Sequence, residues 1–291
     1  MNNYKFISDY KNINKYRLSF NELANNTFGV DFEKWYQYGF WNDSYLCYSY
    51  VDQDNVVANV SISKLNIILD KKEFKGLQVG TVMTHPDYRN MGLSKSLMEI
   101  MLKELEPNFD FVYLFANKSV LDFYPKFGFK KAEQYRFSSE IKIKSNYEKA
   151  KMLDINNEED RKIIKRLSRE RIPISQICSV KNGEAILGWY CVNVFNENIF
   201  YLKEDDVIVI FKTENEVLHL YDIVSKNNIM ISEILEKISN FEIKRVVFYY
   251  TPDYFDFQIT KEAHEDSNDT LFMKPLLNVT KDFVFPLTAH A

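Results

Sequence analysis

The segment from Val82 to Ser94 carries the clearest chemical signal in the 291-residue sequence. It reads Val82-Met83-Thr84-His85-Pro86-Asp87-Tyr88-Arg89-Asn90-Met91-Gly92-Leu93-Ser94. A strand is expected to end in this stretch and a helix to begin, and a helix start presents unpaired backbone N–H groups at its positive end. Gly92 lets the backbone approach an anion closely. Helix starts usually gather Asp and Glu, but this one has Lys95, and its first acid is Glu99. The stretch therefore predicts an anion site, although Gly92 alone would fit an ordinary loop.

A second segment follows about 30 residues later and reads Asn117-Lys118-Ser119-Val120-Leu121-Asp122-Phe123-Tyr124-Pro125-Lys126-Phe127-Gly128-Phe129. In this order the two segments resemble the GCN5-related N-acetyltransferases (GNAT). That family's signature is Arg/Gln-x-x-Gly-x-Gly/Ala after a strand reading apolar-x-Val-x-Pro, followed by Phe-Tyr-x-Lys-x-Gly-Phe. Here the first part is Val82-x-Thr84-x-Pro86 and then Arg89-x-x-Gly92-x-Ser94, so Thr84 and Ser94 depart mildly from it. The resemblance covers about residues 1–145.

The resemblance implies acetyl-CoA as the donor and a primary amine as the acceptor, without a metal. It places the pyrophosphate on the amides of Asn90, Met91, Gly92, Leu93 and Ser94, with Arg89 nearby. It places the pantetheine between splayed strands at 77–83 and 111–115, on the backbone of Val82, Met83 and Thr84, where an N–H would polarise the thioester carbonyl. Asn117 would hold the pantetheine arm, and Tyr124 would be the general acid for the departing thiolate. Tyr124 is also consistent with one more core aromatic.

The base that deprotonates the acceptor ammonium is left open by the sequence. The candidates are Glu22, Asp31, Glu33 and His85, or a water that relays to any of them. His85 precedes a proline on the turn and is equally consistent with a solvated loop residue.

Aromatic residues gather between Phe28 and Tyr50, interspersed with carboxylates. In the family, the first two helices and the loop between them select the acceptor, and an aromatic cleft with carboxylates suits a cationic amine. Asp31, Trp35 and Trp41 are therefore the candidate acceptor-binding residues. Most of the aromatics in this stretch are expected to pack the helices onto the sheet instead.

The first half of the chain predicts a mixed sheet flanked by helices. Strands are expected at 4–7, 44–51, 56–67, 77–83, 111–115 and 130–143, and helices at 15–26, 31–38, 93–105 and 118–126. From 93 to 105 the apolar residues follow a helical period, and Pro107 stands just past its end. A strand, a helix and a neighbouring strand predict a βαβ crossover.

The second half repeats this order. Helices are expected at 160–170 and 231–241, and strands at 187–194, 199–203, 207–212, 217–224 and 244–250, which suggests an internal duplication. The polar segment 145–160 separates the halves, so the predicted domains are 1–147, catalytic and acetyl-CoA-binding, and 148–291, a degenerate GNAT-like domain. Its corresponding turn, at 225–230, has no Gly and no Arg-x-x-Gly. The apolar run 283–291 is expected to dock on the body of the protein.

Composition limits the other classes of function. The chain has 37 Lys and Arg against 41 Asp and Glu, a net charge of −4, so it offers no global excess of positive charge for nucleic acid. Its three Cys and four His fit no zinc spacing. The start of the sequence lacks an apolar signal segment, and no apolar run is long enough to cross a membrane. An α/β protein of the cytoplasm, without a membrane partner, is predicted.

The function that this resemblance implies is transfer of acetyl from acetyl-CoA to a small-molecule or peptide amine by direct attack. The alternatives are a non-catalytic acyl-CoA-binding or regulatory module, and a transferase for a longer acyl chain. The sequence leaves the acceptor and the oligomeric state open.

Overall fold

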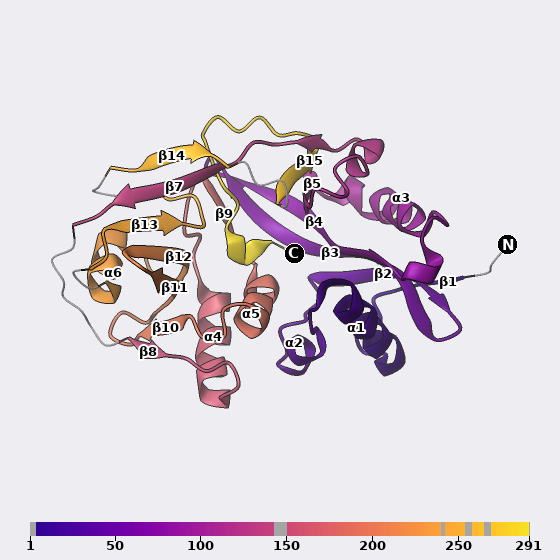
Figure 1. Ribbon diagram of the computed structural model, residues 1–291, viewed down its shortest axis with the longest axis horizontal. Helices are drawn as coiled ribbons and strands as arrows, with labels where there is room; N and C mark the ends of the chain where they lie inside the picture. The colour runs from indigo at the N-terminus through magenta and orange to yellow at the C-terminus, as the bar shows by residue number, and fades with distance from the viewer. Residues whose placement is uncertain (1–3, 143–149, 240–241, 254–257, 265–268, 291) are drawn as a thin grey trace.

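The computed structural model describes residues 4–142, 150–239, 242–253, 258–264 and 269–290. The elements form two mixed sheets that lie side by side, each flanked by helices (Figure 1). The predicted α/β class with two mixed sheets is confirmed. The boundary expected at residue 147 lies outside the described residues.

The first sheet has eight strands within the described residues, in the order β1-β2-β3-β4-β5-β15-β6, with β9 paired to β3. Strands β1 to β4 are antiparallel to one another, whereas β5 runs parallel to β4. The strands are β1 (Lys5–Ser8), β2 (Tyr45–Asp52), β3 (Asn55–Leu69), β4 (Lys72–Thr84), β5 (Phe111–Ala116), β6 (Lys130–Lys131), β9 (Cys178–Val180) and β15 (Thr270–Lys274).

Helices cover both faces of the first sheet (Figure 1). Helices α1 (Asn14–Phe28) and α2 (Glu33–Gln37) lie on one face, and α3 (Leu93–Leu105) lies on the other. The spacing of Leu97, Met98 and Met101 puts these three side chains on one side of α3, where they are fully buried against β3, β4 and β5. Burial of one such side chain contributes about 1.5–3 kcal/mol, which fixes α3 on the sheet.

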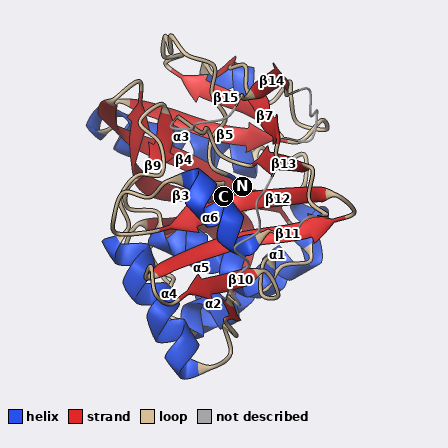
Figure 2. Cartoon of the chain, turned by 90° about the vertical axis from the view of Figure 1, so that its left-hand side faces the viewer, coloured by secondary structure: helices blue, strands red, loops and turns tan. Residues whose placement is uncertain are grey.

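The second sheet has seven strands within the described residues, in the order β14-β7-β13-β12-β11-β10-β8. Figure 2 shows β10, β11, β12 and β13 facing the viewer. The strands are β7 (Tyr135–Glu140), β8 (Lys151–Met152), β10 (Ile199–Leu202), β11 (Val207–Glu214), β12 (Val217–Val224), β13 (Arg245–Phe248) and β14 (Thr260–Ala263). The helices of this half are α4 (Glu158–Glu170), α5 (Glu184–Asn193) and α6 (Ile231–Ile238). Single 3-10 turns lie at Pro86–Tyr88, Glu106–Asn108, Tyr124–Phe127 and Leu287–Ala289.

The same order of elements recurs in both halves, as the sequence predicts. Three antiparallel strands are followed by a helix and then by a parallel strand, as β2-β3-β4-α3-β5 in the first half and β10-β11-β12-α6-β13 in the second. The halves also exchange strands. β7 pairs with β13 in the second sheet, whereas β15, from late in the chain, pairs with β5 in the first.

The prediction of a strand at 187–194 is wrong, because this segment is most of helix α5. Its run Leu-Gly-Trp-Tyr-Cys-Val is continuously apolar and rich in residues that favour strands. The helix is buried on nearly all sides, with only Trp189 half-buried among these six residues, so no polar face marks the helical period. The helix expected at 118–126 is reduced to the 3-10 turn at Tyr124–Phe127, and the strand expected at 130–143 divides into β6 and β7.

One hydrophobic core spans both halves. Trp35, Trp41 and Phe111 from the first half share it with Leu187 from α5 and with Phe285. The ring of Phe285 stacks on Tyr113 of β5 at 4.7 Å between centroids. The expected docking of the run that starts at 283 is therefore confirmed for its described residues, and it brings this run beside the first sheet.

Candidate active site

A cavity of about 600 Å³ opens where β4 and β5 part. Their parallel pairing runs from Gly76 opposite Phe111 to Val79 opposite Leu114 and goes no further among the described residues. The predicted splaying of these two strands is thus present. The cavity is lined by β4 and the start of α3, the segment after β5, the aromatic stretch near α2, helix α5 and the run before residue 291. The lining residues are Phe28, Val30, Phe32, Trp35, Tyr45, residues 79–84, Ser94, Phe115, Asn117, Val120, Phe123, Tyr124, Ile186, Trp189, Tyr190, Asp269, Leu287 and His290.

A bulge in β4 shapes the wall of this cavity. The pairing of β3 with β4 shifts between Asn59 and Ser61, and Thr81 has a φ of 48°, in the left-handed region that side chains rarely adopt. The buried Asn59 amide holds the bulge, because its Nδ2 donates to the Thr81 carbonyl at 2.8 Å. Behind it, Ser49 donates to Asn59 Oδ1 at 2.8 Å. The bulge therefore rests on a buried polar network rather than on ladder bonds.

The start of α3 lies beside the end of β4. Asn90 has a φ of 63° and Gly92 a φ of 78°, and no atom lies within 4 Å of the place where a Cβ on Gly92 would stand. The Thr84 and Ser94 hydroxyls are 2.6 Å apart, which ties the end of the strand to the first turn of the helix. Arg89 Nε donates back to the Thr84 carbonyl at 3.3 Å. The N-cap position is Gly92, so no N-cap side chain accepts a hydrogen bond from the first amides of the helix.

Tyr124 is buried in the wall of the cavity. Its ring contacts Phe123, Phe129 and Phe272 at centroid distances of 5.2, 6.3 and 6.0 Å. Burial raises the pKa of the Tyr124 phenol to about 12. The phenol is therefore protonated at neutral pH and able to donate a proton into the cavity.

Asn117 also lines the cavity, on the side of β5. Its Oδ1 accepts hydrogen bonds from the Ser119 amide at 2.9 Å and from the Ser119 hydroxyl at 2.6 Å. These bonds fix the Asn117 side chain by its oxygen.

The three candidate acceptor residues have different surroundings. Trp35 lines the cavity, and its Nε1 donates to the Ala185 carbonyl of α5 at 2.8 Å. Trp41 is buried behind it, stacked on Trp35 at 5.3 Å, and is absent from the described lining. Asp31 is exposed and accepts from the Glu33 amide at 2.8 Å, which caps α2. Of the three, the structure brings only Trp35 to the cavity.

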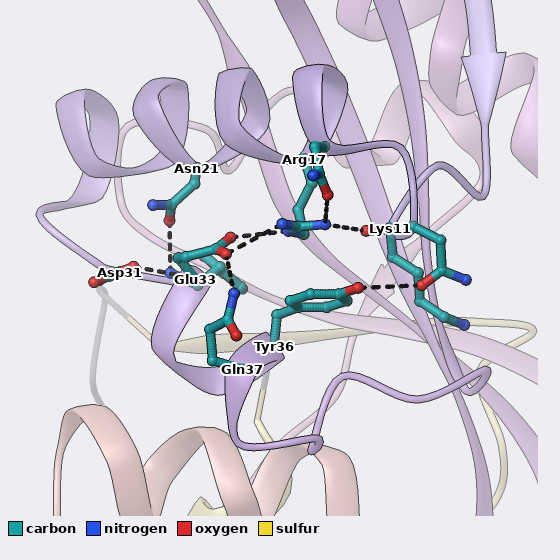
Figure 3. A network of polar contacts seen from close by, with 10 residues as sticks. Lys11, Arg17, Asn21, Asp31, Glu33, Tyr36 and Gln37 are labelled. Carbon is teal, nitrogen blue, oxygen red and sulfur yellow. Dashed lines mark hydrogen bonds and ion pairs between the residues drawn. The ribbon is translucent and has the colours of Figure 1, made fainter.

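The acids near α2 form a separate network (Figure 3). Arg17, which is buried, donates from Nε and Nη2 to the Glu33 carboxylate at 2.9 and 3.2 Å, and Gln37 donates to the same carboxylate at 2.7 Å. The Arg17 hydrogen bond lowers the pKa of Glu33, although burial opposes this. Glu22, Asp31, Glu33 and His85, the bases considered from the sequence, are all outside the described lining of the cavity.

Residues 11–132 match the acetyltransferase (GNAT) domain family. This stretch of the chain is a GNAT acetyltransferase domain. The match includes both segments on which the sequence resemblance rests, from Val82 to Ser94 and from Asn117 to Phe129.

Solved structures of similar fold extend over both halves of the chain. A probable N-acyltransferase from Enterococcus faecalis has a TM-score of 0.61 at 13% identity, over 93% of this chain and 71% of the other. Eis1 from Mycobacterium abscessus has a TM-score of 0.56 at 10% identity, over 93% and 73%. A GCN5-related N-acetyltransferase from Anabaena variabilis has a TM-score of 0.54 at 15% identity, over 92% and 72%. At these identities the likeness shows the fold alone. None of the curated proteins compared with the chain matches it.

The GNAT domain brings most of its predicted donor-binding residues together. Val82, Met83, Thr84, Ser94, Asn117 and Tyr124 line the cavity. The rest of the helix start, Arg89, Asn90, Met91, Gly92 and Leu93, adjoins the cavity through Ser94 without lining it. Their individual roles stay predictions.

None of the site residues predicted from the sequence lies in the wall of the cavity opposite the GNAT domain. Helix α5 supplies Ile186, Trp189 and Tyr190, and Asp269 and His290 come from late in the chain. Nothing in the local sequence marks them as site residues, because tertiary contacts alone bring them to the cavity. The one available signal was the apolar run from 283 on, which includes His290.

The equivalent opening in the second half is filled by the chain itself. β12 and β13 pair up to Leu220 opposite Phe248, and beyond that point the Leu287 amide donates to the Tyr249 carbonyl at 2.9 Å. From the same segment, the Thr288 hydroxyl donates to Asp222 Oδ2 of β12 at 2.5 Å. Residues 284–288 therefore occupy the place that corresponds to the cavity of the GNAT domain.

No group of three or more His, Cys, Asp and Glu side chains in the described part of the chain is placed to hold a metal ion. Within the same residues, no helix is long and apolar enough to span a membrane.

Proposed function

We propose that this protein transfers the acetyl group of acetyl-CoA to a primary amine, in the cavity of its GNAT domain. The single observation that carries the proposal is a juxtaposition in one cavity. The bulged wall of β4, the uncapped start of α3 and the protonated Tyr124 phenol all meet where β4 and β5 part.

The residues present fit the donor. The gap between the parting strands leaves their backbone groups free to bind an extended pantetheine arm, as a further strand would. The open space around Gly92 and the absence of carboxylates from the first turn of α3 leave its amides free for a pyrophosphate. Val82, Met83 and Thr84 would hold the arm, and Asn117 would fix it from the other side.

The reaction needs two aids from the protein. A backbone N–H on the bulged segment of β4 would polarise the thioester carbonyl as the amine nitrogen attacks its carbon. The new C–N bond forms as the C–S bond breaks, and Tyr124 gives its proton to the sulfur. The high pKa of Tyr124 keeps that proton in place until the thiolate leaves.

The acceptor side of the cavity favours an amine on an apolar or aromatic body. Phe28, Phe32, Trp35 and Trp189 surround it, and the Nε1 of Trp189 is buried without a hydrogen-bond partner among the described residues. An unpaired N–H of this kind is a ready donor to a polar atom of the acceptor. Aromatic rings also attract a cationic amine by their faces.

The test measures thiol release from acetyl-CoA with a panel of primary amines, for the wild type and for Tyr124→Phe. We expect turnover with at least one amine and a loss of kcat of about 100-fold in Tyr124→Phe. Acetyl-CoA affinity should be unchanged in Tyr124→Phe and weakened in Gly92→Val, because only Gly92 lies at the pyrophosphate site. Binding of acetyl-CoA with no turnover on any amine would instead indicate a non-catalytic acyl-CoA-binding module. Equal thiol release by the wild type and Tyr124→Phe would refute the role of Tyr124.

A further inference from the structure

A carboxylate and an imidazole line the cavity at positions outside the GNAT family match. Asp269 precedes β15 and His290 follows the 3-10 turn at Leu287–Ala289. Their side chains pair, with 3.5 Å between His290 Nδ1 and Asp269 Oδ2. They share the cavity with Tyr124 although more than 140 residues of sequence lie between.

The His290 ring is held in a fixed orientation. It stacks on Phe115 of β5 with 3.6 Å between ring centroids and 17° between ring planes. His290 is 8% exposed, and its Nε2 is buried without a hydrogen-bond partner among the described residues. One ring nitrogen therefore pairs with a carboxylate while the other is left for a molecule in the cavity.

The backbone that carries His290 is anchored in the second half. Asp222, fully buried, accepts from the Thr288 hydroxyl and is paired with Arg171 through two hydrogen bonds of 2.9 and 2.8 Å. The His290 amide donates to the Leu287 carbonyl at 3.1 Å. The second half thus holds His290 in place at the site of the first.

The ionisation of the side chains that line the cavity points to the same pair, Asp269 and His290. Burial opposes the ionisation of Asp269, but the attraction and hydrogen bond of His290, together with His264, lower its pKa. The phenols that share the cavity, Tyr45, Tyr124 and Tyr190, have pKa values raised by burial and are neutral. Among the described lining residues, Asp269 and His290 are the titratable side chains other than these phenols. A carboxylate with a lowered pKa is the weaker base of the two.

From this geometry we infer that His290 is the general base for the acceptor amine and that Asp269 is its positioning residue. The inference rests on the proposed function. The acceptor arrives as an ammonium, and His290 Nε2 takes one of its protons and passes it to solvent. The neutral nitrogen attacks the acetyl carbon, and it loses a second proton as the C–S bond breaks. The amine nitrogen thus loses two protons. One returns to Tyr124, which has given its own proton to the sulfur, and the other is released to solvent.

The first test compares the wild type with His290→Gln and Asp269→Asn in thiol-release assays across pH, with acetyl-CoA affinity and thermal unfolding as controls. His290→Gln should lose about 100-fold in kcat at pH 7 and recover as pH rises, because the free amine then forms without a base. Acetyl-CoA affinity should stay unchanged. Asp269→Asn should move the acid limb of kcat/KM to lower pH, because the imidazolium loses its carboxylate.

The second readout needs neither donor nor turnover. The His290 imidazole resonance, assigned by its loss in His290→Gln, should titrate at lower pH in Asp269→Asn than in the wild type. If His290→Gln unfolds, the role of His290 is tested on the wild type instead, by measuring the acid limb of its kcat/KM profile with amines of different pKa. One common midpoint supports the inference, and midpoints that follow each amine overturn it.

Failure of the inference is distinct from failure of the proposed function. A wild type that acetylates no amine overturns both. A wild type that does so, with His290→Gln within twofold of it at pH 7, overturns the base alone and leaves the acetyltransferase proposal standing.

Discussion

Gly188, in the middle of α5, lies directly against Phe40 of the first half. A Cβ at this position would lie 2.1 Å from Cδ1 and 2.3 Å from Cγ of Phe40, and 2.8 Å from its Cβ. Carbon atoms pack at about 3.5–4.0 Å. Phe40 is 3% exposed, so its ring has no open space into which it could turn. In Gly188→Ala, the higher helix propensity of alanine therefore stabilises the protein, whereas the steric clash with Phe40 destabilises it.

The two effects have opposite signs. Alanine in a helix interior gains about 1 kcal/mol over glycine. Overpacking costs about 1–3 kcal/mol, and more where the clash involves an atom near the backbone, as the Phe40 Cβ is here. We expect the clash to prevail, with a net loss of about 2 kcal/mol in the free energy of unfolding. Because α5 also carries Ile186 and Trp189, its displacement should raise KM for the amine more than KM for acetyl-CoA.

Urea unfolding followed by far-ultraviolet circular dichroism measures this loss. The matched control is a double-mutant cycle with Phe40→Ala, in which the added methyl has room, so Gly188→Ala should cost less there than in the wild type. If Gly188→Ala is as stable as the wild type, or if the cycle shows no coupling, the contact between α5 and Phe40 is not as described.

Two further predictions concern polar groups away from Gly188. Asn59→Ala removes the donor to the Thr81 carbonyl and should cost about 1–3 kcal/mol in urea unfolding, since it leaves buried polar atoms unpaired; a loss below half of one kcal/mol would contradict this. Asp206 accepts two hydrogen bonds from Arg166, and these lower its pKa. A lowered carboxyl pKa contributes stability above the unfolded value of about 3.9 and loses it as pH falls. Asp206→Asn should therefore be less stable than the wild type at pH 7, and the difference should become smaller as pH falls from about 4 toward 2; an equal difference at pH 7 and pH 2 would count against the ion pair.

The segments proposed to bind the donor could be located from the sequence because their signal is local. A strand end, a glycine in the left-handed region and a helix without early acids are close together in sequence, and Thr84 at the strand end contacts Ser94 in the first turn of the helix. The parallel pair β4 and β5 followed from the period of α3 between two apolar strands.

The acceptor side could not be predicted, because tertiary contacts decide it. The sequence does not distinguish among the aromatic residues of Phe28–Tyr50, yet Trp35 lines the cavity and Trp41 lies behind it. Asp31 accepts a hydrogen bond from the Glu33 amide at the start of α2, and the Glu33 carboxylate is paired with Arg17. Helix α5 read as a strand because its burial removed the polar face that would have shown its period.

The exchange of β15 also bears on how the chain folds as it is made. Ala116 at the end of β5 and Thr270 at the start of β15 are separated by 153 residues. At about 5–20 residues per second, ribosomal synthesis of that stretch takes about 8–30 s. During this interval β5 is an open edge of apolar residues, of the kind that pairs with other chains. The first sheet, although most of it is encoded early, is completed only after β15 has been synthesised, so the β5 edge stays unpaired throughout that interval.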